Sequence, residues 1–253
     1  METAKKWFYR LPFPEYLEEP FLKAISGEET SEAMTNLVNL LSECDKTEEF
    51  YKKKGMPEEI LIETLSDIAV WAENLKIEKG DIGVMETGWL RHHLNCEIFK
   101  IGRLQFMFGK GRFESQEHEL SVGDNTMEVH IPRGEKLTPE LARDSIKRAI
   151  SFFERYFPEY DYKLFTCESW TLDITLRKFL KEGSNLLSFG DLFDRVASYP
   201  STQAFRYLFD LNPNKEIENS FQKQVREFTD NGGKLYQTYG VIPKERAREY
   251  ENL

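Results

Sequence analysis

Residues 127–153 of this chain read MEVHIPRGEKLTPELARDSIKRAISFF, and they indicate the class of fold. The first six residues alternate apolar and polar side chains, which predicts a strand with Glu128 and His130 on one face. Thr138 is a favourable N-cap, and the proline after it suits the first position of a helix. Apolar side chains then recur at helical spacing, which predicts a helix over 139–157. The stretch therefore forms a strand, a loop and a helix in direct succession.

The rest of the second half continues this alternation of strands and helices. Further strands are predicted over 98–108, 162–170, 186–194 and 204–210. In the first of these the apolar parity changes at Gly102 and Arg103, which indicates a bend or bulge there. A helix predicted over 215–231 ends at two glycines, and a short charged tail follows. This order predicts an α/β (α+β) fold with a mixed sheet flanked by helices.

The first half of the chain is mainly helical. Apolar residues at helical spacing predict helices over 31–42 and 58–75, and a third helix is expected over 86–96. We therefore expect two domains. A mostly helical N-terminal domain covers residues 1–125 and ends in a strand region, and a second domain covers residues 126–253.

The composition indicates a globular protein in a reducing compartment. With 253 residues and 40% hydrophobic side chains, the chain is long enough to bury a sizeable core. Its 44 acidic residues exceed its 34 basic ones, and a net charge of −10 argues against nucleic-acid binding. No apolar run approaches the roughly 20 residues of a membrane-spanning helix, and no secretory signal is recognised. The three cysteines lack paired spacing, so we expect a cytoplasmic location.

Six short motifs, taken together in their order and spacing, resemble a known protein family. They are Gly88-Trp89-Leu90-Arg91-x-His93-Leu94, Ile101-Gly102-Arg103-Leu104-Gln105-Phe106, Val129-His130-Ile131-Pro132, Phe152-Phe153-x-x-x-Phe157-Pro158-Glu159, Cys167-x-Ser169-Trp170-x-Leu172-Asp173 and Ser184-Asn185-Leu186. From about residue 57 to 240 the chain resembles the bacterial acyltransferase domain-containing family. That family joins a helical N-acyltransferase N-terminal domain to a GNAT-like C-terminal domain.

The resemblance implies a binding unit for acetyl-CoA or another acyl-CoA as co-substrate, and no metal. The loop over 133–138 would hold the pyrophosphate through Arg133, Gly134, Lys136 and Thr138. This assignment is physically sound, because free backbone N–H groups and the helix dipole attract anions. GNAT enzymes usually carry Q/R-x-x-G-x-G/A in this loop. Here no second glycine follows Gly134, so the close backbone approach that glycine allows is only half supported.

Acyl transfer to an amine needs a base, a donor for the carbonyl oxygen and an acid for the leaving thiolate. His130 is the first candidate for the base, since imidazole titrates near neutral pH. Glu128 could act through a water molecule, and Glu168 could act as acid or base or bind the substrate. Each has a structural alternative, as a hydrogen-bonded histidine or a solvated carboxylate. Cys167 is expected to be a small core residue more than a nucleophile.

The adjacent histidines His92 and His93 do not predict a metal site. Neighbouring side chains on a helix point about 100° apart, so they cannot easily share one ion. The chain also has no H-E-x-x-H motif and no cysteine pair.

The function expected from these observations is an acyl-CoA-dependent N-acyltransferase (GNAT-like) with an unknown amine acceptor. We expect a small-molecule acceptor, with neither nucleic acid nor membrane as partner, and the oligomeric state stays open. The alternative is a non-catalytic ligand-binding or interaction module on a GNAT-like fold. The incomplete glycine pattern favours the module, whereas the polar face at Glu128 and His130 favours the enzyme.

Overall fold

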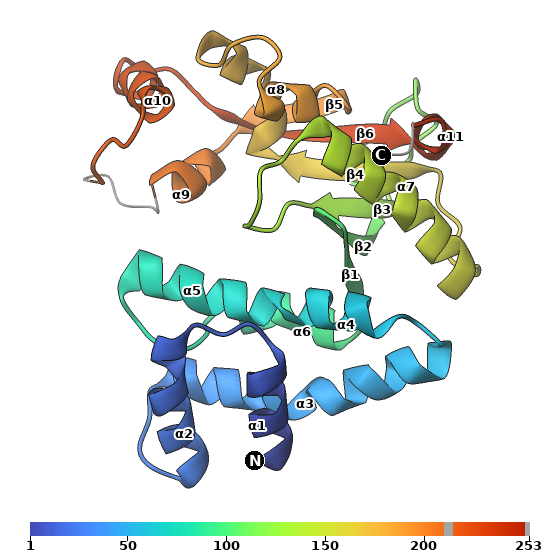
Figure 1. The fold of residues 1–253 in the computed structure, drawn as a ribbon. Coiled ribbons are helices and arrows are strands. Elements are labelled where there is room, and N and C mark those ends of the chain that lie inside the picture. Colours follow the sequence, from blue (N-terminus) through green and yellow to red (C-terminus); the bar gives the residue numbers. More distant parts are fainter. Residues whose placement is uncertain (210–214, 251–253) are drawn as a thin grey trace. The chain divides into compact units, whose positions relative to one another are not determined.

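The computed structural model describes residues 1–209 and 215–250, and the chain divides into two compact units (Figure 1). Residues 1–101 form the first unit, called the helical unit here, and residues 102–253 form the second, called the α/β unit. The expected fold class, helices followed by a mixed sheet with helices, is confirmed. The expected domain boundary at residue 125 lies later in the chain than the division between these two units.

The helical unit contains more helix than the sequence patterns predicted. Its elements are α1 (Glu2–Arg10), the short turn Glu15–Leu17, α2 (Glu18–Ser26), α3 (Glu32–Lys54), α4 (Glu58–Leu65), α5 (Asp67–Lys79), α6 (Thr87–Leu94) and the strand β1 (Ile98–Ile101). The helix expected to stop at residue 42 continues to Lys54, and the helix expected over 58–75 is interrupted at Ser66. Across the described ranges no helix has the length and apolar character needed to cross a bilayer.

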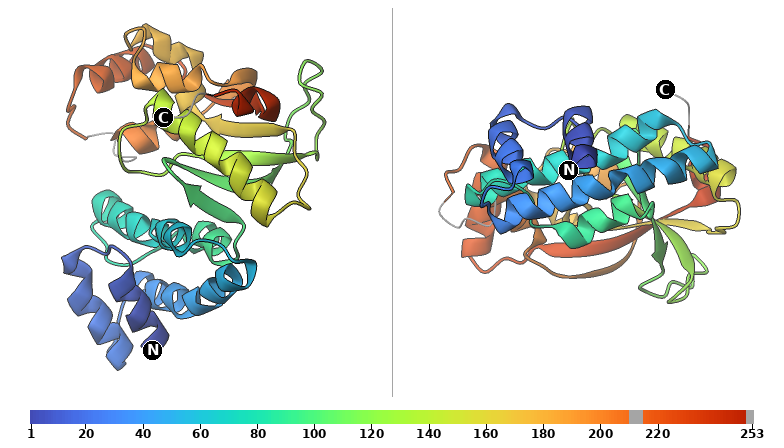
Figure 2. Two further views of the ribbon diagram at one scale, coloured as in Figure 1. Left: turned by 45° about the vertical axis from the view of Figure 1, so that its right-hand side comes forward. Right: turned by 90° about the horizontal axis from the view of Figure 1, so that it is seen from below.

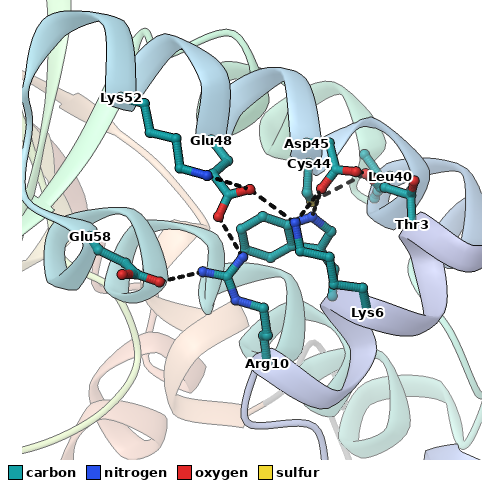
Figure 3. A network of polar contacts seen from close by, with 10 residues as sticks. Thr3, Lys6, Arg10, Leu40, Cys44, Asp45, Glu48, Lys52 and Glu58 are labelled. Carbon is teal, nitrogen blue, oxygen red and sulfur yellow. Dashed lines mark hydrogen bonds and ion pairs between the residues drawn. The ribbon is translucent and has the colours of Figure 1, made fainter.

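Helix α1 is fastened to α3 by a network of charged side chains (Figure 3). Lys6 Nζ lies 2.8 Å from Asp45 Oδ1 and 2.9 Å from Glu48 Oε2. Arg10 Nη1 lies 2.7 Å from Glu48 Oε1, and the indole N–H of Trp7 donates to Asp45 at 2.7 Å. The Trp7 side chain itself is completely buried. The network therefore holds an aromatic anchor of α1 in the core of the helical unit.

The α/β unit is built on a mixed sheet. Its elements are β2 (Leu104–Lys110), β3 (Asn125–His130), α7 (Pro139–Tyr156), β4 (Leu164–Ser169), two short 3₁₀ turns (Trp170–Leu172 and Ile174–Lys178), α8 (Asn185–Gly190), β5 (Asp194–Pro200), α9 (Gln203–Phe209), α10 (Ser220–Asp230), β6 (Tyr236–Pro243) and α11 (Lys244–Arg248). Within this unit the strand order of the sheet is β2-β3-β4-β6-β5. Within the α/β unit β3 and β4 are parallel, and the other neighbouring strands are antiparallel.

Three predictions for the last third of the chain are wrong. Residues 185–190 and 203–209 are helices rather than strands, because their short apolar runs fit a buried face of either element. The strand in this region lies later, over 194–200. The tail after the two glycines is not simply a charged end. It forms β6, which lies between β4 and β5 in the sheet.

The sheet of the α/β unit has one face covered by α7 (Figures 1 and 2). On this face the Phe108 ring meets Phe153 of α7 at 5.5 Å between centroids, and Phe106 meets Phe165 at 5.9 Å. The predicted N-cap is confirmed, since Thr138 Oγ1 accepts a hydrogen bond from the amide of Leu141. Alternate residues of each strand point to the other face, away from α7.

Candidate functional site: a polar pocket where two parallel strands separate

The parallel strands β3 and β4 are paired over a very short length. Their register contains only Met127 opposite Phe165 and Glu128 opposite Thr166. Beyond these pairs β3 stays paired with β2 as far as His130, while β4 stays paired with β6 over its whole length. The carboxyl ends of β3 and β4 therefore separate beyond Glu128 and Thr166.

A pocket of about 230 Å³ lies where the two strands separate. Its lining includes the three candidate catalytic residues, Glu128, His130 and Glu168. The remaining lining residues are Arg112, Val129, Thr166, Gln203, Gln237 and Tyr239. The structure therefore brings together side chains that lie about 40 residues apart in sequence.

The strand register explains why these side chains converge. Glu128 is opposite Thr166, and Glu168 is opposite Tyr239, so each pair points to the same face of the sheet. His130 lies two residues after Glu128 and shares its face, as the sequence predicted. The pocket therefore lies on the polar face of the sheet, which is the face opposite α7.

Within the pocket, Glu128 and His130 are close enough to interact. Their Oε2 and Nε2 atoms are 3.4 Å apart, and the two side chains are 25% and 30% exposed. The imidazole is thus partly exposed, although its Nε2 atom beside the carboxylate is shielded from solvent. The arrangement suits a base whose charged form a neighbouring carboxylate stabilises.

Glu168 is held by two further side chains that the sequence did not place here. Its carboxylate accepts hydrogen bonds from the hydroxyl of Tyr199 and from the guanidinium of Arg112. Burial, together with the Glu168 carboxylate beside it, raises the pKa of Tyr199 to about 12. Tyr199 thus keeps its proton and acts as a donor. Glu168 is an anchored acceptor, which fits binding of a cationic group better than proton transfer.

Cys167 lies on the face of β4 opposite to Glu168 and is 3% exposed. Burial raises the pKa of its thiol above the usual range, so the reactive thiolate is disfavoured. Cys44 and Cys96 are likewise free and buried, in the helical unit. Cys167 is therefore a core residue, as expected, and has no role in the pocket.

The loop before α7 is anchored by Arg103, which the sequence pattern indicated only as part of a bend. Its Nε donates to the carbonyl of Glu135 at 2.8 Å, and its Nη1 donates to the carbonyl of Pro132 at 2.9 Å. The Arg103 amide also donates to Ser145 Oγ of α7 at 2.8 Å. The Gly-Arg bend was visible in the sequence, but the partner of the arginine depends on how the chain folds back. The loop is thus fixed to both strand β2 and helix α7.

The loop is open to solvent on the side of Gly134. A Cβ atom added at Gly134 would meet nothing within 4 Å, and the φ angle of this residue is +153°. Arg133 and Lys136 are exposed beside it, and the Thr138 cap starts α7 directly afterwards. The four residues predicted to bind the cofactor therefore lie in one loop that ends at the N-terminus of α7. Two cations and a helix dipole make this surface suited to a phosphate group.

The two adjacent histidines of the helical unit point to different partners. His93 is fully buried with its Nε2 atom 3.2 Å from Asp67 Oδ2, whereas His92 Nδ1 lies 2.5 Å from Glu97 Oε2. They do not converge on a common point. In the described parts of the chain, no three side chains of the kinds that bind metals are grouped together.

These features define a class: a two-unit α/β protein with a polar pocket at the separated ends of two parallel strands. Comparison with protein families identifies both parts. Residues 8–96 match the N-acyltransferase N-terminal domain, and residues 98–242 match the GNAT-like C-terminal domain. The chain belongs to the family that carries this GNAT-like C-terminal domain.

Solved structures of acyltransferases share the fold. One in complex with decanoyl-CoA and teicoplanin aligns with a TM-score of 0.81 and 20% identity, over 96% of this chain and 88% of its own. One in complex with decanoyl-CoA aligns at 0.79 and 22%, over 95% and 87%. One in complex with CoA and 10C-teicoplanin aligns at 0.74 and 22%, over 83% of this chain and 66% of its own. No curated protein matches this chain with significant similarity.

Proposed function

We propose that this protein transfers an acyl group from acyl-CoA to the amine of a small molecule. The observation that carries the proposal is the pairing of Glu128 and His130 in a polar pocket where β3 and β4 separate. The open loop at the start of α7 supports a site for the donor next to this pocket. The structural relatives, crystallised as acyltransferases with CoA, decanoyl-CoA or octanoyl-CoA, support the same donor class.

In this proposal the donor lies along the part of β3 beyond Glu128, where β3 and β4 are no longer in register and an extended chain can lie beside the strand. Arg133, Gly134, Lys136 and the helix start at Thr138 would hold the pyrophosphate. Arg103 compensates for the missing second glycine, because it donates to the carbonyl of Glu135 within the loop and to that of Pro132 just before it. The loop can thus keep one open conformation with a single glycine.

The proposed chemistry assigns one role to each candidate side chain. The bound ammonium group first releases one proton to the solvent, which leaves a neutral amine. Its nitrogen then attacks the thioester carbonyl while His130 takes a second proton from it, and the carbon–sulfur bond breaks. His130 passes this proton to the departing sulfur, so the products are the amide, the CoA thiol and the one proton released at the start. Glu128 stabilises the charged imidazole. Glu168 binds the amine in its ammonium form before the reaction, with Tyr199 and Arg112 keeping the carboxylate in place.

The proposed acceptor is a small molecule rather than a nucleic acid or a membrane, because the pocket presents two carboxylates in a chain of net charge −10. One structural relative was crystallised with teicoplanin as well as decanoyl-CoA, which supports a small-molecule acceptor. The free cysteines support a reducing compartment such as the cytoplasm.

The test of the donor site is thermal unfolding of the full chain with millimolar CoA or acetyl-CoA. A ligand at 100 times its dissociation constant stabilises the folded state by about 2.7 kcal/mol, which raises the midpoint by several degrees. Gly134→Trp should abolish this rise, because the indole would fill the open side of the loop. Gly123→Trp is the matched control, since Gly123 also has positive φ and open space but lies in another loop.

No rise with either ligand would contradict the proposal. The non-catalytic module would then be the better interpretation. A rise that Gly134→Trp leaves intact would place the phosphate-binding surface elsewhere in the chain.

A further inference from the structure

The α7 face of the sheet has no room for an acyl chain. Phe106, Phe153 and Phe165 fill this side of the α/β unit, and none of the three is more than 1% exposed. Interiors packed in this way hold few voids larger than a water molecule. A tail that enters the gap between β3 and β4 must therefore turn toward the polar face.

On the polar face the available space is small and hydrophilic. The pocket has about 230 Å³, below the roughly 300–1,000 Å³ of sites that enclose a drug-sized ligand. Two carboxylates, an imidazole and two carboxamides contribute to its lining, whereas the lining residue Val129 directs its side chain to the opposite face of β3. A long alkyl chain would remove these polar groups from water without replacing their hydrogen bonds, which is unfavourable.

Tyr239 belongs both to the pocket lining and to an apolar cluster. It is 2% exposed, and it shares the cluster with Leu120, Leu164 and Val241. The Phe113 ring packs on Tyr239 from this cluster, with 5.1 Å between centroids. The tyrosine ring thus lies at the boundary between the polar pocket and this packed apolar cluster.

We infer that the donor carries a short acyl group, such as acetyl to butanoyl, and that Tyr239 sets this limit. The inference rests on the proposed function, since it specifies the donor of the same site. It also distinguishes this chain from the structural relatives that were crystallised with decanoyl-CoA or octanoyl-CoA. Tyr239 acts here as a specificity-determining residue that blocks the way into an apolar cluster.

The first experiment is calorimetric titration of the full chain with CoA and with acetyl-, butanoyl-, octanoyl- and decanoyl-CoA. A tail that enters an apolar channel gains roughly fourfold in affinity for each methylene group. We expect no such gain beyond butanoyl-CoA, so that octanoyl- and decanoyl-CoA bind no more tightly than butanoyl-CoA. Affinity that keeps rising to decanoyl-CoA would overturn the inference while supporting the proposed function. Failure of CoA and of every thioester to bind would overturn both.

The second experiment tests Tyr239 directly. Tyr239→Leu joins the pocket to the apolar cluster and should raise the affinity for octanoyl-CoA, relative to butanoyl-CoA, at least tenfold. Phe113→Leu is the matched control, because it removes a ring from the same cluster without opening the pocket. Tyr239→Phe keeps the barrier and should keep the wild-type dependence on chain length. An unchanged ratio in a folded Tyr239→Leu protein would overturn the role of this residue, and if that variant does not fold, the wild-type titration still decides the chain length.

Discussion

Arg103 shows how one buried side chain can fix a loop that the sequence describes poorly. Its guanidinium is planar and carries several N–H donors, so it reaches the carbonyl groups of Pro132 and Glu135 at once. With only 7% exposure, the residue is shielded from the water that would otherwise compete for these hydrogen bonds. The conformation of the loop before α7 therefore depends on a residue from the turn that precedes β2.

Arg103→Lys should weaken both the loop and the donor site. Lysine keeps the charge but lacks the fork that binds two carbonyls, so one carbonyl loses its partner. We expect the free energy of unfolding to fall by about 1–3 kcal/mol, and the dissociation constant of CoA to rise about tenfold. Urea unfolding and calorimetry measure the two effects. Arg177→Lys, at an exposed ion pair with Asp191, serves as the control and should leave CoA binding unchanged.

His130→Ala should lower turnover at least about a hundredfold while the midpoint of thermal unfolding stays close to that of the wild type. The reason is that the proposed base is lost from a partly exposed position, where little packing depends on it. Release of CoA from acetyl-CoA with a panel of amines measures the rate. His92→Ala, in the helical unit, is the control. Turnover that survives in His130→Ala would remove this residue from the mechanism.

At the scale of residues, the sequence could predict only the part of the pocket that local periodicity controls. Glu128 and His130 alternate with Val129 on one strand, so their common face follows from the pattern. Tyr239 comes to line the pocket, and Tyr199 comes to contact Glu168, through the pairing of β5, β6 and β4, strands far apart in sequence. A single sequence carries no signal for such long-range pairing.

At the scale of elements, β6 illustrates why a strand can be missed. Its residues Tyr236–Pro243 include aromatic and β-branched types, but they follow two glycines and contain Gly240. Glycine normally weakens a strand. Here a Cβ atom at Gly240 would lie 2.8 Å from Cβ of Phe193, so packing against a neighbouring segment requires the glycine. The helix α7, by contrast, was predictable because its cap and its periodicity agree.

The docking of α1 on α3 should depend on pH through Glu48. The hydrogen bond from Lys6, with further contacts to Arg10 and Lys52, lowers the pKa of Glu48 from 4.5 to about 2. Because the folded-state pKa is depressed, the stabilisation is complete above about pH 4.5 and is lost as the pH falls toward 2. Glu48→Gln should therefore reduce the loss of stability between pH 6 and pH 3.

Urea unfolding followed by tryptophan fluorescence at several pH values measures this dependence, because the buried Trp7 donates a hydrogen bond to Asp45 of the same network. Glu49→Gln changes an exposed glutamate one residue further along α3 and should leave the pH dependence as it is in the wild type. If the free energy of unfolding of Glu48→Gln falls with pH as steeply as that of the wild type, other carboxylates dominate the acid sensitivity of the helical unit.

At the scale of the whole molecule, the order of a helical part and an α/β part could be predicted, since the sequence changes from helical spacing to strand formers near Glu97. It could not be predicted that residues 102–125 belong to the α/β unit. This stretch contains β2 and the following loop, and pairing between Phe106 and Val129 makes it part of the α/β unit. Antiparallel pairing across a loop of this length is decided by the packed sheet rather than by local pattern.

The three buried cysteines can be used to detect transient opening of the two units. Cys44 and Cys96 lie in the helical unit and Cys167 in β4, and burial raises the thiol pKa of each, to about 12 for Cys96. An alkylating reagent can therefore modify them only when the surrounding structure opens transiently. Mass spectrometry of a labelling time course should yield a separate opening rate for each unit. Bound CoA should slow the labelling of Cys167 more than that of Cys44, and rapid labelling of Cys167 in the native protein would contradict its burial.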